Sequence, residues 1–324
     1  MSIPDWLEFF ERPFPSANTI LVRGKQAMLV DSGFGSDLPA TEKWLREVGT
    51  APSELGLVLN THYHSDHVGG NFGLQQRYNL PIAAHRWEAS MVNSRNREVG
   101  SANYLDQPIE PYRVDRLLND GDEIDTGDVT LQIIHTPGHT SGHICLYEPS
   151  EGVLICGDVL QSNDVGWINI FREGAGALQQ AMDSVSKLQQ LPLRQIIPGH
   201  GPTINNPAEV LAAAWRRYEK WLTEPQKMAW HGCKRIFAYK LMIGNGLNEL
   251  DVRPFLLGCA WFVDYSRHFF AAYPPDFVET FVAEMTRSGA AGWQNGRLIA
   301  LTPHHPPPPD WLRSPSQPQD WPRL

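Results

Sequence analysis

The segment Thr61-His62-Tyr63-His64-Ser65-Asp66-His67 carries the most information about this chain. It places three imidazoles and one carboxylate within six positions, directly after the apolar run Leu57-Val58-Leu59. Side chains two apart on an extended segment point the same way, so His62 and His64 can reach one metal ion together. Asp66 and His67 come where the loop turns into the next predicted helix, so they can face a second, adjacent ion.

Three later segments add further metal-binding side chains, each beside a glycine. They are Thr136-Pro137-Gly138-His139-Thr140-Ser141-Gly142-His143, Cys156-Gly157-Asp158 and Pro198-Gly199-His200-Gly201. Neutral imidazole suits zinc and other borderline divalent ions, and a carboxylate adds charge and can bridge. The five imidazoles of His62, His64, His67, His139 and His200, with Asp66 and Asp158, therefore predict two divalent metal ions. Zinc is the first choice, with iron and manganese as alternatives.

Composition excludes some classes of function. The chain has 324 residues, is 42% hydrophobic and carries a formal net charge of −9, whereas a general nucleic-acid binder needs a basic surface. The charge is uneven: residues 1–207 carry −11 and residues 208–301 carry +2. The sequence contains no apolar stretch of 18 residues, so we expect no membrane-spanning helix. The start, Met1 to Trp6, lacks the basic and apolar character of a secretory signal, so we expect a cytoplasmic protein.

The sequence pattern predicts three regions. Residues 1–207 alternate strands with helices, which indicates sheets covered by helices and a catalytic domain. Residues 208–301 form a helical C-terminal domain that ends in an Asn295-Gly296 hairpin turn, a combination that suggests a winged-helix-like shape. Residues 302–324 form a proline-rich, extended tail. The expected helices of the second region are 208–223, 225–243, 251–270 and 275–288. Residues 86–118 are interpreted as a loop-rich insertion that covers a site.

Taken together, these motifs resemble the metallo-β-lactamase superfamily. The H-x-H-x-D-H stretch followed by Gly69-Gly70, the T-P-G-H stretch, the Gly-Asp after a strand and the late Gly-His occur in the family's order, from about residue 15 to 205. The resemblance implies an α/β fold, the four-layer αβ/βα sandwich. It implies one ion on His62, His64 and His139, and a second ion on Asp66, His67 and His200. Asp158 would bridge the two ions, and Asp31 resembles the family's early structural aspartate.

The motifs also indicate which branches of the superfamily the chain resembles. Asp158 disfavours the antibiotic-degrading branches, which often have cysteine at the corresponding position. His64 disfavours the redox di-iron branch, which typically has glutamate at the corresponding position. The remaining pattern resembles glyoxalase II, related thioesterases and the N-acyl-homoserine lactonases. Gln161 stands where the lactonases usually carry tyrosine, which weakens that interpretation. Nucleases of the superfamily stay open, although the acidic first region argues against a polyanionic substrate.

The function that follows is a metal-dependent hydrolase of a small acyl substrate, a thioester or related ester, that uses a hydroxide bridging the two ions. Asp66 and Asp158 are the catalytic candidates. The alternatives are a lactonase, a phosphodiesterase or nuclease, and a binding module without activity. We expect no membrane partner and no nucleic-acid partner, and a homodimer is left open.

Several other side chains are weaker candidates. Tyr104, Trp167 and Phe171 fall in loops near the motifs and are candidate pocket walls. His231 is a candidate lid residue, and His143 is expected to support the site without binding metal. The alternative for each is ordinary packing.

Overall fold

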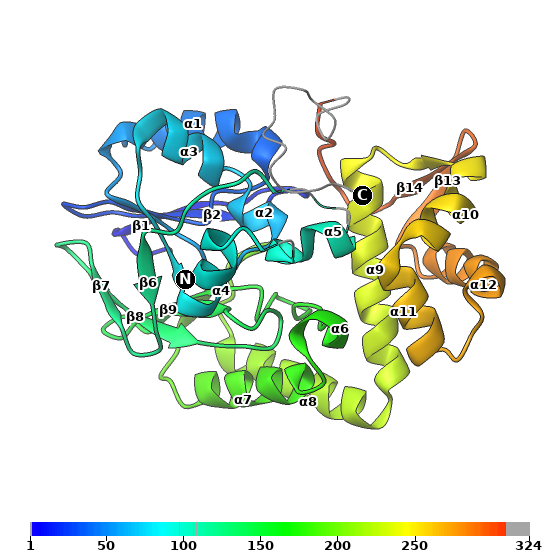
Figure 1. The fold of residues 1–324 in the computed structure, drawn as a ribbon. Coiled ribbons are helices and arrows are strands. Elements are labelled where there is room, and N and C mark those ends of the chain that lie inside the picture. Colours follow the sequence, from blue (N-terminus) through cyan, green and yellow to red (C-terminus); the bar gives the residue numbers. More distant parts are fainter. Residues whose placement is uncertain (1, 97, 106, 108, 309–324) are drawn as a thin grey trace.

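A computed structural model describes residues 2–96, 98–105, 107 and 109–308 of the chain. Residues 309–324, which make up most of the predicted proline-rich tail, lie outside the described residues. Within the described part, the chain forms two large sheets, a small third sheet and a set of helices, in the arrangement of Figure 1.

The first sheet has six strands in sequence order. They are β1 (Leu7–Phe10), β2 (Thr19–Val22), β3 (Met28–Val30), β4 (Leu57–Leu59), β5 (Ile82–His85) and β6 (Arg116–Leu118). β2 and β3 form an antiparallel hairpin, and β4 leads directly into the histidine motif. From β3 to β6 all neighbours pair in parallel. The sequence pattern did not reveal β1 or β6, which have only four and three residues.

The second sheet has five strands, in the spatial order β11-β10-β9-β8-β7. Their bounds are β7 (Glu123–Asp125), β8 (Thr130–His135), β9 (Ile144–Glu148), β10 (Val153–Gly157) and β11 (Gln195–Pro198). β10 and β11 pair in parallel, while β9 runs antiparallel to both β8 and β10. As a result, β8, β10 and β11 all point the same way. β7, with three residues, is the shortest strand of this sheet.

The strands form a four-layer sandwich because their side chains alternate between two faces. In the first sheet, Leu21 and Val58 pack outward under helices, whereas Ile20 and Leu59 pack inward against the second sheet. Helices α1 (Leu38–Glu47), α3 (Asn71–Tyr78) and α4 (Arg86–Asn93) cover the first sheet. Helices α7 (Ala177–Gln189) and α8 (Pro207–Thr223) cover the second (Figure 1). The predicted layer order is therefore confirmed.

Short helices join these layers near the edge where the polar motifs lie. They are α2 (Ser65–Val68), α5 (Ala102–Leu105) and α6 (Ile170–Glu173). The predicted loop-rich insertion thus contains α4, α5 and β6 as well as loops. Tyr104 and Leu105 of α5 pack into the hydrophobic cluster of the C-terminal region, so the insertion connects the sandwich with that region.

The C-terminal region is mostly helical, as predicted. After α8 come α9 (Pro225–Ile243), α10 (Glu249–Gly258), α11 (Ala260–His268) and α12 (Pro274–Arg287), followed by the hairpin β13 (Ala291–Gln294) and β14 (Arg297–Ala300). Asn295 and Gly296 both have positive φ at its turn, as an Asn-Gly hairpin requires. A two-residue strand, β12 (Leu247–Asn248), adds to β14.

One helix prediction was wrong. The sequence pattern predicts a single helix over 251–270, whereas the structure has α10 and α11 separated at Cys259, whose backbone is extended. The apolar periodicity continues across the break because residues on both sides, Leu256 and Trp261, are buried in the same cluster. The break follows Gly258, a residue that costs stability inside a helix. Pro254 lies inside α10.

Helix α9 stands between the sandwich and helices α10–α12 (Figure 1). It buries residues along most of its length, including Ala229, Phe237 and Leu241. This position lets one helix contribute both to the C-terminal core and to a cavity beside the sandwich. Among the described residues, no helix combines the length and the apolar character that a bilayer crossing needs.

Candidate metal centre

The ends of five strands bring polar side chains to one edge of the sandwich. Asp31 follows β3, His62 follows β4 closely, His139 follows β8, Asp158 follows β10 directly, and His200 follows β11. In each sheet these strands point the same way, so their carboxyl ends meet at a common edge. Helix α2 begins right after His64 and adds Asp66 and His67. All seven metal-ligand candidates from the sequence therefore come together.

The first group consists of His62, His64 and His139, whose ring nitrogens converge. His62 Nε2 lies 3.1 Å from His64 Nδ1, which lies 2.9 Å from His139 Nε2. Nitrogens bound to a tetrahedral zinc at about 2.0–2.1 Å lie roughly 3.3 Å apart. The three rings therefore have nearly the spacing that a shared ion would impose, and they form a set that could hold one.

The other ring nitrogens of this group show which lone pairs are available. His139 Nδ1 donates to the backbone oxygen of Trp167 at 2.7 Å, which leaves its Nε2 as a lone pair. Burial and the neighbouring imidazoles lower the pKa of His62 well below its ordinary value. Burial and His139 lower the pKa of His64 to about 3. Neutral imidazoles whose ring nitrogens converge in this way are suited to hold a cation between them.

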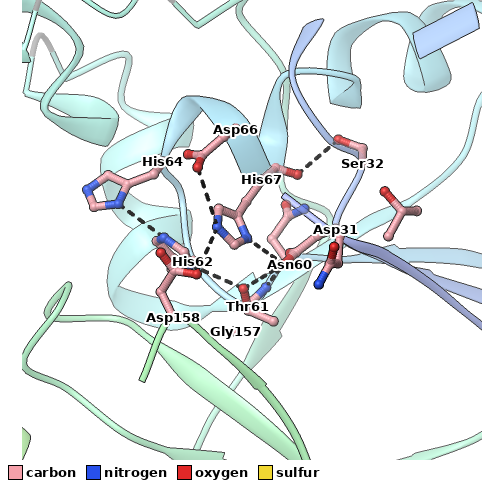
Figure 2. A network of polar contacts seen from close by, with 12 residues as sticks. Asp31, Ser32, Asn60, Thr61, His62, His64, Asp66, His67, Gly157 and Asp158 are labelled. Carbon is pink, nitrogen blue, oxygen red and sulfur yellow. Dashed lines mark hydrogen bonds and ion pairs between the residues drawn. The ribbon is translucent and has the colours of Figure 1, made fainter. Parts of the chain in front are cut away.

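The second group consists of Asp66, His67 and His200, with Asp158 beside it. His200 Nε2 lies 3.1 Å from Asp66 Oδ2, and His67 Nε2 lies 3.9 Å from the same oxygen. Asp158 Oδ1 lies 3.3 Å from His67 Nε2 and 3.7 Å from His200 Nε2. Its other oxygen, Oδ2, lies 3.6 Å from His139 Nε2 in the first group. One carboxylate thus faces both groups, and Figure 2 shows Asp158 beside His62 and His67.

Two atoms at the centre of this arrangement are buried without a hydrogen-bond partner. They are His67 Nε2 and Asp158 Oδ1. Burial opposes charge on His67, but the carboxylates of Asp31, Asp158 and Asp66 outweigh it and raise the pKa of His67 well above its ordinary value. Burial likewise opposes ionisation of Asp158, yet His200 and His67 hold its pKa well below the usual range. The site therefore favours positive charge, and these residues fit a pair of divalent cations.

Buried contacts behind the site fix the orientation of its side chains. Asp31 Oδ2 lies 2.7 Å from His67 Nδ1 and accepts from the Thr61 hydroxyl at 2.7 Å (Figure 2). His143 Nε2 accepts from the backbone N–H of Asp158 at 3.1 Å. These contacts match the supporting positions expected for Asp31 and His143. Partners of this kind set the tautomer and the ring plane of metal-binding histidines.

Two glycines allow the backbone to approach the site closely. A Cβ at Gly199 would lie 2.5 Å from Asp158 Oδ1 and 2.8 Å from His67 Cε1. A Cβ at Gly157 would lie 2.6 Å from His143 Nε2, and its φ of 48° also favours glycine. Gly199 and Gly157, which stand beside His200 and Asp158, are therefore required by packing at the site.

Sequence reasoning missed several residues around the site. The Phe14 ring stacks on His200, with centroids 4.6 Å apart. Asn18 donates its side-chain N–H groups to the backbone oxygens of Pro198 and Gly201, on either side of His200. Tyr239 of α9 donates to Pro15 O at 3.1 Å. Such contacts join segments up to 224 positions apart, and no local pattern indicates them.

A cavity of about 510 Å³ opens beside the two groups. Trp167, Asp66, Asp158 and His200 are among its lining residues, as the sequence suggested for Trp167. Tyr104 and Phe171 instead pack into the C-terminal core. For these two residues the structure therefore agrees with ordinary packing, the alternative to a role as pocket walls. His231, the candidate lid residue, lies 2.8 Å from Asp164 and does not line the cavity.

Comparison with known proteins agrees with this geometry. The sequence model described as the metallo-beta-lactamase superfamily matches residues 12–200, which is more than half of the chain. The chain therefore belongs to the metallo-beta-lactamase superfamily. It is 32% identical to a hydroxyacylglutathione hydrolase of Chelativorans sp. over 50% of this chain and 53% of that protein. It is 30% identical to the acyl-coenzyme A thioesterase MBLAC2 of Gallus gallus, over 57% of this chain and 72% of that protein.

The chain spans about half the length of the first curated relatives it matches. Among solved structures, a metallo-beta-lactamase family protein of Thermus thermophilus superposes with a TM-score of 0.61 at 20% identity. That match covers 92% of this chain and 100% of the other, so it extends over the C-terminal region as well. At this identity the likeness concerns the fold alone, which confirms the expected architecture.

Proposed function

We propose that the chain is a dinuclear metal-dependent hydrolase that cleaves a small acyl substrate. A thioester is the preferred candidate, and other esters are the alternative. The observation that carries this proposal is the position of Asp158, with one oxygen toward His139 and the other toward His67 and His200. A carboxylate that faces two groups of nitrogen and oxygen ligands suits a bridge between two cations. The names of the relatives, which are thiol-ester hydrolases, support the substrate class.

In this proposal the seven side chains divide between two ions. His62, His64 and His139 would hold one ion, Asp66, His67 and His200 would hold the other, and Asp158 would be shared. Zinc is the first choice, and iron(II) or manganese would also accept these ligands. Ions bound there would supply a water molecule acidified to a pKa near 7 and polarise a carbonyl oxygen.

The chain's own residues have supporting roles in this reaction. Asp31 and the Trp167 carbonyl keep His67 and His139 in the tautomer that directs Nε2 to the centre. Asp66 lines the cavity, and His67 and His200 help to lower its pKa although burial opposes this. Its carboxylate can therefore accept a hydrogen bond from an attacking water. All four cysteines are buried, so none offers a competing exposed nucleophile.

The cavity also has a contribution from the C-terminal region. Residues 1–207 hold all the proposed ligands, while α9, the turn at residues 288–290 and Thr302 complete the walls. We propose accordingly that residues 1–207 perform the reaction and that residues 208–301 shape the substrate cavity. Gln161 lines the cavity where the lactonases usually carry tyrosine. We therefore favour a thioester over a lactone as the substrate.

A substrate panel tests this function. The purified chain, loaded in turn with zinc, manganese and iron(II), should hydrolyse S-acetyl-2-mercaptoethanol faster than N-acyl-homoserine lactone or bis-p-nitrophenyl phosphate. Preference for the phosphodiester would contradict the acyl substrate class. Full thioesterase activity after exhaustive removal of metal would contradict the metal-dependent reaction.

A further inference from the structure

Glu88, on α4, carries a buried carboxyl group that is not among the seven ligand candidates. It is 1% exposed, and its helix directly follows β5 of the first sheet. Glu88 Oε1 accepts a hydrogen bond from the Thr140 hydroxyl at 2.7 Å. Thr140 comes directly after His139, the one ligand candidate of the first group that follows a strand of the second sheet. One hydrogen bond thus joins a helix on the first sheet to the loop that carries His139.

The loop over residues 136–143 is shaped around this carboxyl. A Cβ at Gly142 would lie 2.4 Å from Glu88 Cγ and 3.0 Å from Glu88 Cδ, so a side chain there would displace Glu88. The backbone N–H of Gly138 donates to the backbone oxygen of Thr140 at 3.2 Å, which places His139 inside a tight turn. Thr140 itself is fully buried. A displacement of Thr140 would therefore move His139 with it.

Helix α4 also contacts the histidine motif. The rings of Trp87 and Tyr63 meet edge to face, with centroids 5.9 Å apart. The backbone of Tyr63 is close enough to the Glu88 carboxyl to lower its pKa, against the effect of burial. Tyr63 lies between His62 and His64 in the chain. The same turn of α4 therefore contacts both segments that supply the first group of ligand candidates.

The Glu88 carboxyl is costly to bury. Burial raises its pKa well above the ordinary value, and the Thr140 hydroxyl opposes this only in part. Glu88 Oε2 is buried without a hydrogen-bond partner. A leucine would fill a similar volume without burying polar atoms, so packing alone does not require a carboxyl here. The contribution that leucine could not make is the directional contact with Thr140.

We propose that Glu88 is a positioning residue that sets the distance between His139 and the histidine motif through its hydrogen bond with Thr140. The inference rests on the proposed function, which assigns His139 to the first ion. The Trp167 carbonyl orients the His139 ring, whereas Glu88 holds the backbone that carries it. Glu88 is not one of the described residues that line the cavity, so it acts on the ion through the loop.

Zinc affinity, measured by competition with a chromophoric chelator, tests this role. Glu88→Leu should lower the affinity of one of the two zinc sites about tenfold, as the loss of partners that support metal ligands does. Glu88→Gln keeps an acceptor oxygen for the Thr140 hydroxyl and should restore the wild-type affinity. In the cobalt(II)-loaded protein, the visible absorption of Glu88→Leu should change, whereas that of Glu88→Gln should match the wild type.

The double variant Glu88→Leu/Thr140→Val separates positioning from stability. Replacing both partners of a buried hydrogen bond by apolar groups of similar shape can leave stability nearly unchanged, while the directional contact stays absent. We therefore expect thermal melts near those of the wild type together with the low zinc affinity of Glu88→Leu. Zinc affinity that recovers together with stability would overturn the positioning role. Wild-type zinc affinity in folded Glu88→Leu would overturn it as well.

Glu148→Leu is the matched control. Glu148 is also a buried glutamate that accepts from a hydroxyl group, Ser150 Oγ, at 2.7 Å. It is the last residue of β9, which runs antiparallel to β8 and β10, so it lies at the opposite edge of the second sheet from the ligand candidates. The control should bind zinc as tightly as the wild type, whatever its melting temperature.

The same measurements distinguish failure of the positioning role from failure of the proposed function. If the zinc affinities change as expected but no thioester is cleaved, the proposed substrate class fails and the positioning role stands. If the wild type cleaves thioesters and Glu88→Leu binds zinc equally well, only the positioning role fails. A wild type that binds no metal would contradict both.

Discussion

Oδ2 of Asp31 lies 2.7 Å from Nδ1 of His67, and both side chains are buried. This contact turns the imidazole so that its Nε2 faces Asp158, where it has no hydrogen-bond partner. Asp31 also has a left-handed backbone, with φ of 58°, which places its carboxylate under the loop that carries Thr61. The early aspartate therefore orients a histidine of the candidate metal centre.

Asp31→Asn should weaken metal binding without unfolding the chain. The amide cannot hold the Nδ1–H tautomer of His67 as the carboxylate does, and loss of such partners lowers metal affinity or activity about 10- to 100-fold. Metal titration and kcat/KM for a neutral thioester measure the effect. Asp183→Asn, at an exposed position on α7, is the control and should match the wild type. Equal affinity in Asp31→Asn would show that the contact has no role in metal binding.

Gly199→Ala should inactivate the chain through the geometry of the site. The new methyl group would meet Asp158 Oδ1 at 2.5 Å and His67 Cε1 at 2.8 Å, so at least one of these side chains must move. We expect a loss of at least tenfold in kcat/KM, because small displacements of reacting groups are costly. Gly176→Ala is the control, since a methyl group there meets nothing within 4 Å. Normal activity in Gly199→Ala would mean that the centre tolerates displacement.

The His85 ring should make stability depend on pH. Burial, the stacked His135 and then Arg86 lower the pKa of His85 to about 4 in the folded chain, while Asp120 acts in the opposite direction. The unfolded chain, with an ordinary histidine pKa near 6.5, binds more protons between these values. The free energy of unfolding should therefore fall as pH drops from about 6.5 to 4.

Urea denaturation of the metal-loaded chain at pH 7 and pH 4.5 measures this effect. His85→Gln should lose less stability over that interval than the wild type, because the glutamine does not titrate. His305→Gln, at an exposed position, should behave like the wild type. An identical loss in His85→Gln and the wild type would contradict the assignment of this proton uptake to His85.

The sequence pattern identified seven candidate ligands that the fold brings together, because their motifs are local. His62, His64, Asp66 and His67 lie within six positions, and His139, Asp158 and His200 follow strands whose apolar runs are distinct. The strand and helix pattern predicted sheets covered by helices, and the four-layer order came from the resemblance to the family. What escaped prediction depends on contacts between distant segments, such as Phe14 on His200 and Tyr239 on the Pro15 carbonyl.

The cavity wall on α9 shows a limit of a different kind. Arg235, Ala238, Tyr239 and Met242 recur at helical spacing, so the sequence did contain an amphipathic face. It could not show that this face meets a cavity, because α9 also buries residues in the C-terminal core. The break at Cys259 was missed because burial on both sides continued the apolar period across it.

The most direct test of the account is the metal content of the purified chain at saturation. After incubation with zinc and removal of free ions by gel filtration, elemental analysis should find two equivalents per chain in the wild type. Asp158→Asn should retain about one equivalent or less and lose thioesterase activity. A folded wild type that binds no zinc, iron(II) or manganese at saturating concentrations would contradict the proposed centre.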